Sequence, residues 1–107
     1  MSDEVRISGR LIAAARALTG IGQADFATAA GLSLETLRLM ESNGGEWLSA
    51  REDIEAAHRG LLYFGVILIA ESDGLGAGVR LKFTRQDVRQ IARLEGEGGI
   101  VGSDDAP

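Results

Sequence analysis

Apolar residues in the first 64 positions recur at intervals of three and four, which is the period of amphipathic helices. Ser8 and Ser33 stand where a serine caps a helix start, and Ser49 with Glu52 forms an S-x-x-E capping box. This pattern predicts four helices, over about residues 8–18, 23–30, 33–42 and 49–64. The spacing places the following apolar side chains inward: Leu11, Ile12, Ala15, Leu18, Phe26, Ala27, Ala30, Leu37, Met40, Ile54, Ala57 and Leu61.

The period of the pattern changes after Gly65. Residues 66–69 form an apolar run typical of a strand covered on both faces. Val79 and Leu81 alternate with charged residues, as in a half-exposed strand. The segment ESDGLGAG between them is rich in turn residues, so we expect a β-hairpin. Thr84 and Asp87 are candidate caps for a last helix that ends near residue 94.

These elements predict a mainly α single domain, because 107 residues suffice for one modest core. We expect a flexible N-terminus over residues 1–7 and a four-helix unit over 8–64. The hairpin and the last helix follow over 65–94 as a dimerisation element. The glycine-rich acidic segment 95–107 is expected to be disordered.

Composition and charge narrow the function classes. The chain has no cysteine, which excludes disulfides and thiolate metal sites. It shows neither a secretory signal nor an apolar run of the roughly 20 residues that a membrane helix needs, so we expect a cytoplasmic protein that uses no membrane. The net charge of −5 argues against nucleic acid, but residues 5–94 hold all 11 basic residues and 10 of the 16 acidic ones. The body is therefore nearly neutral and the ends are acidic.

Candidate catalytic chemistry is sparse. His58 is the only histidine and lies within the fourth predicted helix, with Glu55 one turn before it. The acidic residues near position 52 suit a helix start through the helix dipole. The sequence shows no nucleophile with a base and no cluster of metal ligands. We expect neither an enzyme nor a cofactor.

The segment QADFATAAGLSLETLRLME, residues 23–41, encodes two short helices with one glycine between them. Small Ala27 lies where the helices must approach closely, and Gly31 makes the turn. Two helices joined this way cross at a steep angle, so one can span the phosphate backbone while the other enters the major groove. This geometry is suited to binding double-stranded DNA.

The segment resembles the lambda repressor/Cro class of helix-turn-helix regulators, often called the xenobiotic-response-element family. The match covers residues 8–64, and the later GVRL segment after the glycine-rich turn resembles a small bacterial subgroup. The resemblance implies a transcriptional regulator, a dimeric repressor, that uses residues 33–42 as its recognition helix. The motif residues that carry it are Arg16, Gln23, Ala27, Gly31, Leu32, Leu37, Met40 and Glu41.

The resemblance also implies residue roles. Arg16 and Glu41 would form an internal ion pair, and Gln23 would contact a phosphate unless it is only a solvent-facing polar residue. The DNA-contacting positions of the recognition helix would be Ser33, Leu34, Glu35, Thr36, Arg38 and Leu39.

The expected base-reading positions depart from the common family pattern. Leu34 and Leu39 offer only apolar contact to a thymine methyl, whereas Glu35 can accept a hydrogen bond from cytosine N4. Specificity would then be weak or depend on DNA shape. The sequence leaves two roles open for Arg38, which are a phosphate contact and a pairing with a neighbouring glutamate. An alternative function is therefore a helix-turn-helix fold used for protein contact, as in an antitoxin or a regulatory adaptor.

The hairpin leads to an assembly hypothesis. A lone two-stranded hairpin is marginal in water, so we expect hairpin-to-hairpin pairing in a homodimer. The last predicted helix carries a basic row, which is either a solvated face or a surface for nucleic acid or a protein partner. The expected dimerisation residues are Val66, Ile67, Leu68, Ile69, Val79 and Leu81, and the basic row is Arg85, Arg89 and Arg93.

Overall fold

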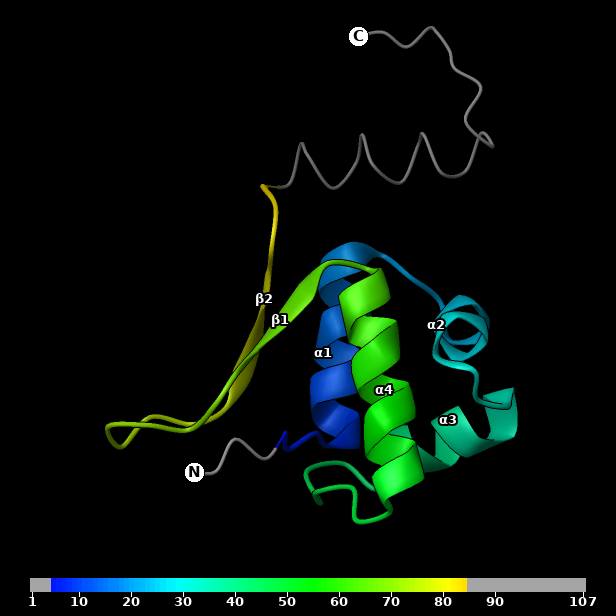
Figure 1. Ribbon diagram of the computed structural model, residues 1–107, viewed down its shortest axis with the longest axis horizontal. Helices are drawn as coiled ribbons and strands as arrows, with labels where there is room; N and C mark the ends of the chain where they lie inside the picture. Colours follow the sequence, from blue (N-terminus) through cyan, green and yellow to red (C-terminus); the bar gives the residue numbers. More distant parts are fainter. Residues whose placement is uncertain (1–4, 85–107) are drawn as a thin grey trace, which may run out of the picture.

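The computed structural model describes residues 5–84, which form four helices followed by a two-stranded antiparallel hairpin. Figure 1 shows α4 beside α1, with α2 and α3 on one side of this pair and the hairpin projecting on the other. The predicted last helix with Arg85, Arg89 and Arg93, and the segment 95–107, lie outside the described residues. The elements are α1 (Gly9–Thr19), α2 (Gln23–Ala30), α3 (Leu34–Ser42), α4 (Arg51–Tyr63), β1 (Val66–Ile69) and β2 (Gly78–Leu81).

Helix α1 begins where the sequence predicted. The Oγ of Ser8 accepts a hydrogen bond from the Leu11 N–H at 3.2 Å, which caps the helix. The helix ends at Gly20, whose left-handed φ of 74° lets its N–H reach the Arg16 carbonyl at 2.7 Å. Leu18 was predicted to be inward but is 47% exposed, because the buried stripe of α1 stops at Ala15 and its final turn has no apolar cover.

The core lies between the four helices and the start of β1. Phe26 of α2 is buried, and its ring stacks on Phe64 with the ring centroids 6.1 Å apart. Gly60 of α4 lies against the same ring, where a Cβ would come within 2.7 Å of Phe26. The absence of a side chain at Gly60 therefore lets α4 pack closely on α2. The largest fully buried side chains are Phe26, Ile7, Ile12, Leu37 and Leu61.

The core begins before the first helix. Residues 1–7 were predicted to be flexible, but Ile7 is fully buried and its carbonyl accepts a hydrogen bond from the Leu48 N–H at 2.8 Å. Val5 also packs against the core. The prediction is therefore wrong for the end of this segment, because its apolar side chains pack under the chain that leads into α4.

Helix α4 starts later than its predicted capping box. The chain stays extended through Ala50, with φ −77° and ψ 130°, and the helix begins at Arg51 with no side-chain cap. Ser49 is thus one residue too early to cap the helix, so the predicted Ser49–Glu52 box is wrong. Glu52 and Asp53 nevertheless lie in the first turn, where negative charge suits the helix dipole.

The hairpin has a two-residue turn. Asp73 and Gly74 have φ angles of 53° and 79°, and Ser72 and Leu75 exchange backbone hydrogen bonds of 3.1 and 2.8 Å around them. Two successive positive φ angles are the mark of a type I′ turn, which matches the natural twist of antiparallel strands. The register pairs Val66 with Leu81, Ile67 with Arg80, Leu68 with Val79 and Ile69 with Gly78.

The two faces of the hairpin differ. Val66, Leu68, Val79 and Leu81 share one face and pack against the helical core. Ile67 and Ile69 lie on the opposite face and are 42% and 43% exposed. The prediction that β1 is covered on both faces is therefore wrong among the described residues, because the helices lie against one face only.

Candidate nucleic-acid interface

The turn between α2 and α3 is fixed by backbone geometry. Gly31 has a left-handed φ of 78°, and the Leu32 N–H reaches back to the Ala27 carbonyl at 2.9 Å. This bond closes the end of α2 in the manner of a Schellman motif. Gly31 and Ala27 were both selected from the sequence as the residues that make this turn possible. The turn holds the start of α3 in a defined position next to the end of α2.

Arg59 of α4 supports the same turn from the other side. Its Nη2 donates to the Ala30 carbonyl at 2.8 Å, so a positive charge lies at the C-terminus of α2, where the helix dipole favours it. This role could not be predicted from the sequence, because Arg59 lies 29 positions from Ala30 and helical periodicity gives no signal for such a contact.

The start of α3 carries two of the predicted DNA-contacting residues. The Oγ of Ser33 accepts from the Thr36 N–H at 3.0 Å, and its hydroxyl donates to the Thr36 Oγ1 at 2.9 Å. Ser33 therefore caps α3, as its position predicted. Both side chains are engaged with each other, so their first role is to define the helix start.

The outward face of α3 is open to solvent. Glu35 and Arg38 are exposed, Leu34 is half-buried, and Leu39 is 63% exposed although it is apolar. Together with Thr36 and Ser42, Glu35, Arg38 and Leu39 line a shallow depression on this face. The opposite face of the helix is buried through Leu37 and Met40, so α3 is anchored on one side and free on the other.

A polar network ties three helices together behind this face. The guanidinium of Arg16 binds the Glu41 carboxylate through two bonds, Nε to Oε2 at 2.7 Å and Nη2 to Oε1 at 2.8 Å. Gln23 Nε2 donates to the same Oε1 at 3.0 Å. The ion pair expected from the resemblance is therefore present. Gln23 was expected to contact a phosphate, but here its amide joins the network because α2 begins directly beside Glu41.

Burial and hydrogen bonding oppose each other at Glu41. Its side chain is 10% exposed, and this burial by itself would raise the pKa of the carboxyl. The hydrogen bonds from Arg16 and Gln23, with the attraction of the Arg16 charge, outweigh it and hold the pKa of Glu41 below its usual range. The same hydrogen bond to Glu41 has the opposite effect on Arg16 and raises the pKa of its guanidinium. The pair is ionised and acts as a clamp between α1, α2 and α3.

The structure divides the predicted dimerisation residues into two sets. Val66 is 2% exposed, and Leu68, Val79 and Leu81 pack against the core of their own chain. These four side chains pack within the protomer, so they do not form the exposed apolar surface that the sequence predicted for an interface. Only Ile67 and Ile69 present their side chains on the open face of the hairpin.

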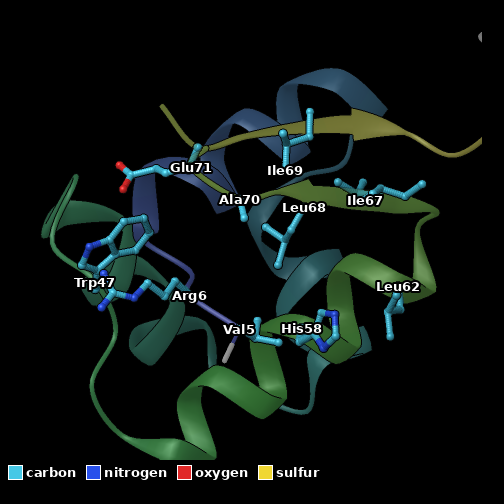
Figure 2. A pocket seen from close by; sticks show the side chains of 12 residues that line it. Val5, Arg6, Trp47, His58, Leu62, Ile67, Leu68, Ile69, Ala70 and Glu71 are labelled. Atoms are coloured by element: carbon cyan, nitrogen blue, oxygen red, sulfur yellow. The ribbon is translucent and has the colours of Figure 1, made fainter. Parts of the chain in front are cut away.

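A groove of about 510 Å³ runs beside β1, between the hairpin and the N-terminal segment (Figure 2). His58 and Leu62 of α4 border it, and Arg6 stacks on Trp47 at its other end, with the guanidinium carbon 5.4 Å from the ring centroid. Trp47 is 37% exposed and forms part of the wall of this groove. No group of three or more metal-ligating side chains occurs within residues 5–84.

Comparison with known proteins assigns neither a family nor a function to this site. No protein-family model matches the chain, and no curated protein or solved structure matches it either.

Proposed function

We propose that this protein is a DNA-binding transcriptional regulator of the helix-turn-helix type, acting as a repressor, with α3 as its recognition helix. The observation that carries the proposal is the two-sided character of α3. Its inner face is locked to the core by Leu37 and Met40, while Glu35, Arg38 and Leu39 face solvent. A rigid helix with one free face, joined to α2 by a tight turn, has the shape that enters a major groove.

The side chains on the free face suggest how DNA would be read. Arg38 is the one cation of α3 and would neutralise a phosphate or bond to guanine. Leu39 offers apolar contact to a thymine methyl, and Glu35 can accept from cytosine N4. This set supplies few paired hydrogen bonds, so the proposal includes a large contribution from DNA shape.

The test is a salt titration of duplex binding by the intact chain. Fluorescence anisotropy with a pool of labelled random duplexes between 50 and 200 mM salt should show affinity that falls steeply as salt rises, because phosphate contacts release counterions. Selection of the bound fragments from the same pool would define the operator. Absence of duplex binding at 50 mM salt would overturn the proposal.

Two arginine variants test whether α3 makes the contact. Arg38→Ala should weaken binding and reduce the salt slope by about 1. Arg80→Ala removes the same charge from the exposed face of the hairpin, where it lies opposite Ile67, and should leave the slope unchanged. Equal effects of the two variants would show that only net charge matters, which contradicts the assignment of α3.

A second candidate function is a protein-interaction module, such as an antitoxin or a regulatory adaptor. The exposure of Leu39, 63%, favours it, because an apolar side chain at the centre of a free helix face is typical of a protein interface. Leu39→Lys separates the two functions. The added cation should preserve or increase duplex affinity in a DNA-binding protein, whereas it should abolish binding to a protein partner.

A further inference from the structure

We propose that the chain forms a homodimer in which the free edge of β1 pairs with the same edge of a second copy, antiparallel and centred on Leu68. This proposal is independent of DNA binding. It rests on the direction of the backbone groups in β1, the open groove beside that strand, and the exposed face of the hairpin.

The hydrogen-bond ladder shows which backbone groups of β1 are free. The Lys82 N–H donates to the Gly65 carbonyl at 2.7 Å, so residue 65 directs its polar groups toward β2. Because this direction alternates along an antiparallel strand, the backbone N–H and C=O groups of Ile67 and Ile69 also point toward β2. The backbone N–H and C=O groups of Leu68 therefore point away from β2. Within residues 5–84 no backbone bond from another segment reaches Leu68 on that side.

The groove shows that this edge is open. Its wall includes six consecutive residues, 66–71, and only the edge of a strand presents consecutive residues to one space, because successive side chains alternate between faces. Figure 2 shows β1 running along one side of the groove, with Val5 and His58 on the other. The edge is thus accessible to an added strand, and an open edge of this kind is a ready template for β-pairing.

The edge of β1 is complementary to itself. In an antiparallel pairing centred on Leu68, the N–H and C=O of Leu68 in each copy would exchange hydrogen bonds with Leu68 of the second copy. In the same register Ile67 of one copy lies directly opposite Ile69 of the other. These are apolar cross-strand pairs, which stabilise a sheet, and no like charges are brought together within the strand. The backbone groups and side chains of this edge therefore match those of a second copy in this register.

The exposed face of the hairpin supports the same partner. Ile67 and Ile69 are more than 40% exposed in the single chain, and pairing would place four isoleucines side by side on one continuous sheet. Two hairpins would become a four-stranded sheet, which is more stable than an isolated two-stranded one. The isologous contact also gives the two-fold symmetry common to most homodimers.

The first experiment is sedimentation equilibrium of the intact chain between 1 and about 100 micromolar. The wild type should reach the mass of two chains, and Ile69→Lys should lower the association constant by at least tenfold, because a charged side chain at the pairing edge opposes strand addition. The matched control is Leu75→Lys. Leu75 is 72% exposed at the hairpin turn, outside the proposed contact, so this variant should associate like the wild type.

Three outcomes of this experiment would overturn the proposal. They are a monomeric wild type at the highest concentration, an Ile69→Lys variant that still dimerises, and a Leu75→Lys variant that dissociates equally. Circular dichroism of each variant checks that the helices remain folded, which is expected since both positions are exposed.

The second experiment tests the register by disulfide formation. The chain has no cysteine, so Ile67→Cys and Ile69→Cys each introduce a single thiol. An oxidised mixture of the two variants should give more cross-linked dimer than either variant alone, because residues 67 and 69 of different copies lie opposite each other. Identical residues would be offset by two positions along the strands, with Cα atoms roughly 8 Å apart, beyond the usual disulfide range. Equal yields in all three samples would contradict the register.

Discussion

The helical body and the hairpin bury their apolar surface in different ways. In the body, α1 to α4 surround side chains such as Phe26 and Leu37, which are almost fully buried. In the hairpin, β1 and β2 bury one face on the helices and leave Ile67 and Ile69 exposed on the other. Within residues 5–84, the helical body completes its core, whereas the hairpin keeps an open edge and an open face. The two regions should therefore respond very differently to the same kind of substitution.

The largest contrast is expected for loss of an apolar side chain. Phe26→Ala should reduce the free energy of unfolding by about 3–5 kcal/mol, because it leaves a cavity between α2 and α4. Ile69→Ala should cost about 1 kcal/mol or less, since Ile69 is 43% exposed. Urea denaturation at low micromolar concentration measures both values. Similar losses would show that the hairpin face is covered within the single chain.

Added bulk should give the next largest contrast. A Cβ on Gly9 would lie 1.9 Å from the Met40 carbonyl oxygen, so α1 and α3 must separate in Gly9→Ala. We expect a loss of about 2–3 kcal/mol. In the hairpin, a Cβ on Gly78 meets nothing within 4 Å, and Gly78→Ala should remain within about 0.5 kcal/mol of the wild type. Thermal unfolding followed by circular dichroism compares them.

The polar clamp of the body should have a smaller effect. Glu41→Ala removes the acceptor of two bonds from Arg16 and one from Gln23, and it should cost about 2 kcal/mol in urea denaturation. Glu46→Ala removes the same charge from the exposed loop before α4 and should change stability by less than about 0.5 kcal/mol. An equal loss in both variants would mean that net charge, rather than the clamp, is responsible.

Acid should remove the same clamp. Since the pKa of Glu41 is lower in the folded chain than in the unfolded one, the clamp contributes stability above about pH 4.3 and loses it as pH falls through the folded pKa. The difference in stability between the wild type and Glu41→Gln should therefore be constant from pH 7 to about pH 5 and shrink below about pH 4. Scanning calorimetry across this range measures it. A difference that does not decrease as pH falls below about 4 would contradict the role of the ionised carboxylate.

Much of the local structure could be predicted from the sequence. The start of α1 at Ser8, the turn at Gly31 and the start of α3 at Ser33 were all placed correctly, because each depends on neighbouring residues in the chain. The predicted cap at Ser49 is wrong because the start of α4 does not depend on neighbouring residues alone. The extended path through Ala50 is set by how the chain reaches α4, and the local motif does not encode that path.

The candidate site was predicted less completely than the fold. The sequence identified α3 and its exposed residues, because helical periodicity separates Leu37 and Met40 from Arg38 and Leu39. It gave no sign that Gln23 would bond to Glu41 or that Arg59 would support the turn. These contacts join residues far apart in the chain, and no local pattern reports them.

Which features the sequence specifies and which only the tertiary structure decides depends on the range of the interactions involved. Caps, turns and amphipathic faces arise from interactions within a few residues, so the order of amino acids specifies them directly. Which face of β1 is covered, and which of its edges stays open, depends on where the helices lie when the chain folds. The same four apolar residues, 66–69, are consistent with a strand covered on both faces or on one. Only the packing of α4 against β1 and of α1 against β2 selects the second arrangement, in which Val66 and Leu68 face the core and Ile67 and Ile69 stay exposed.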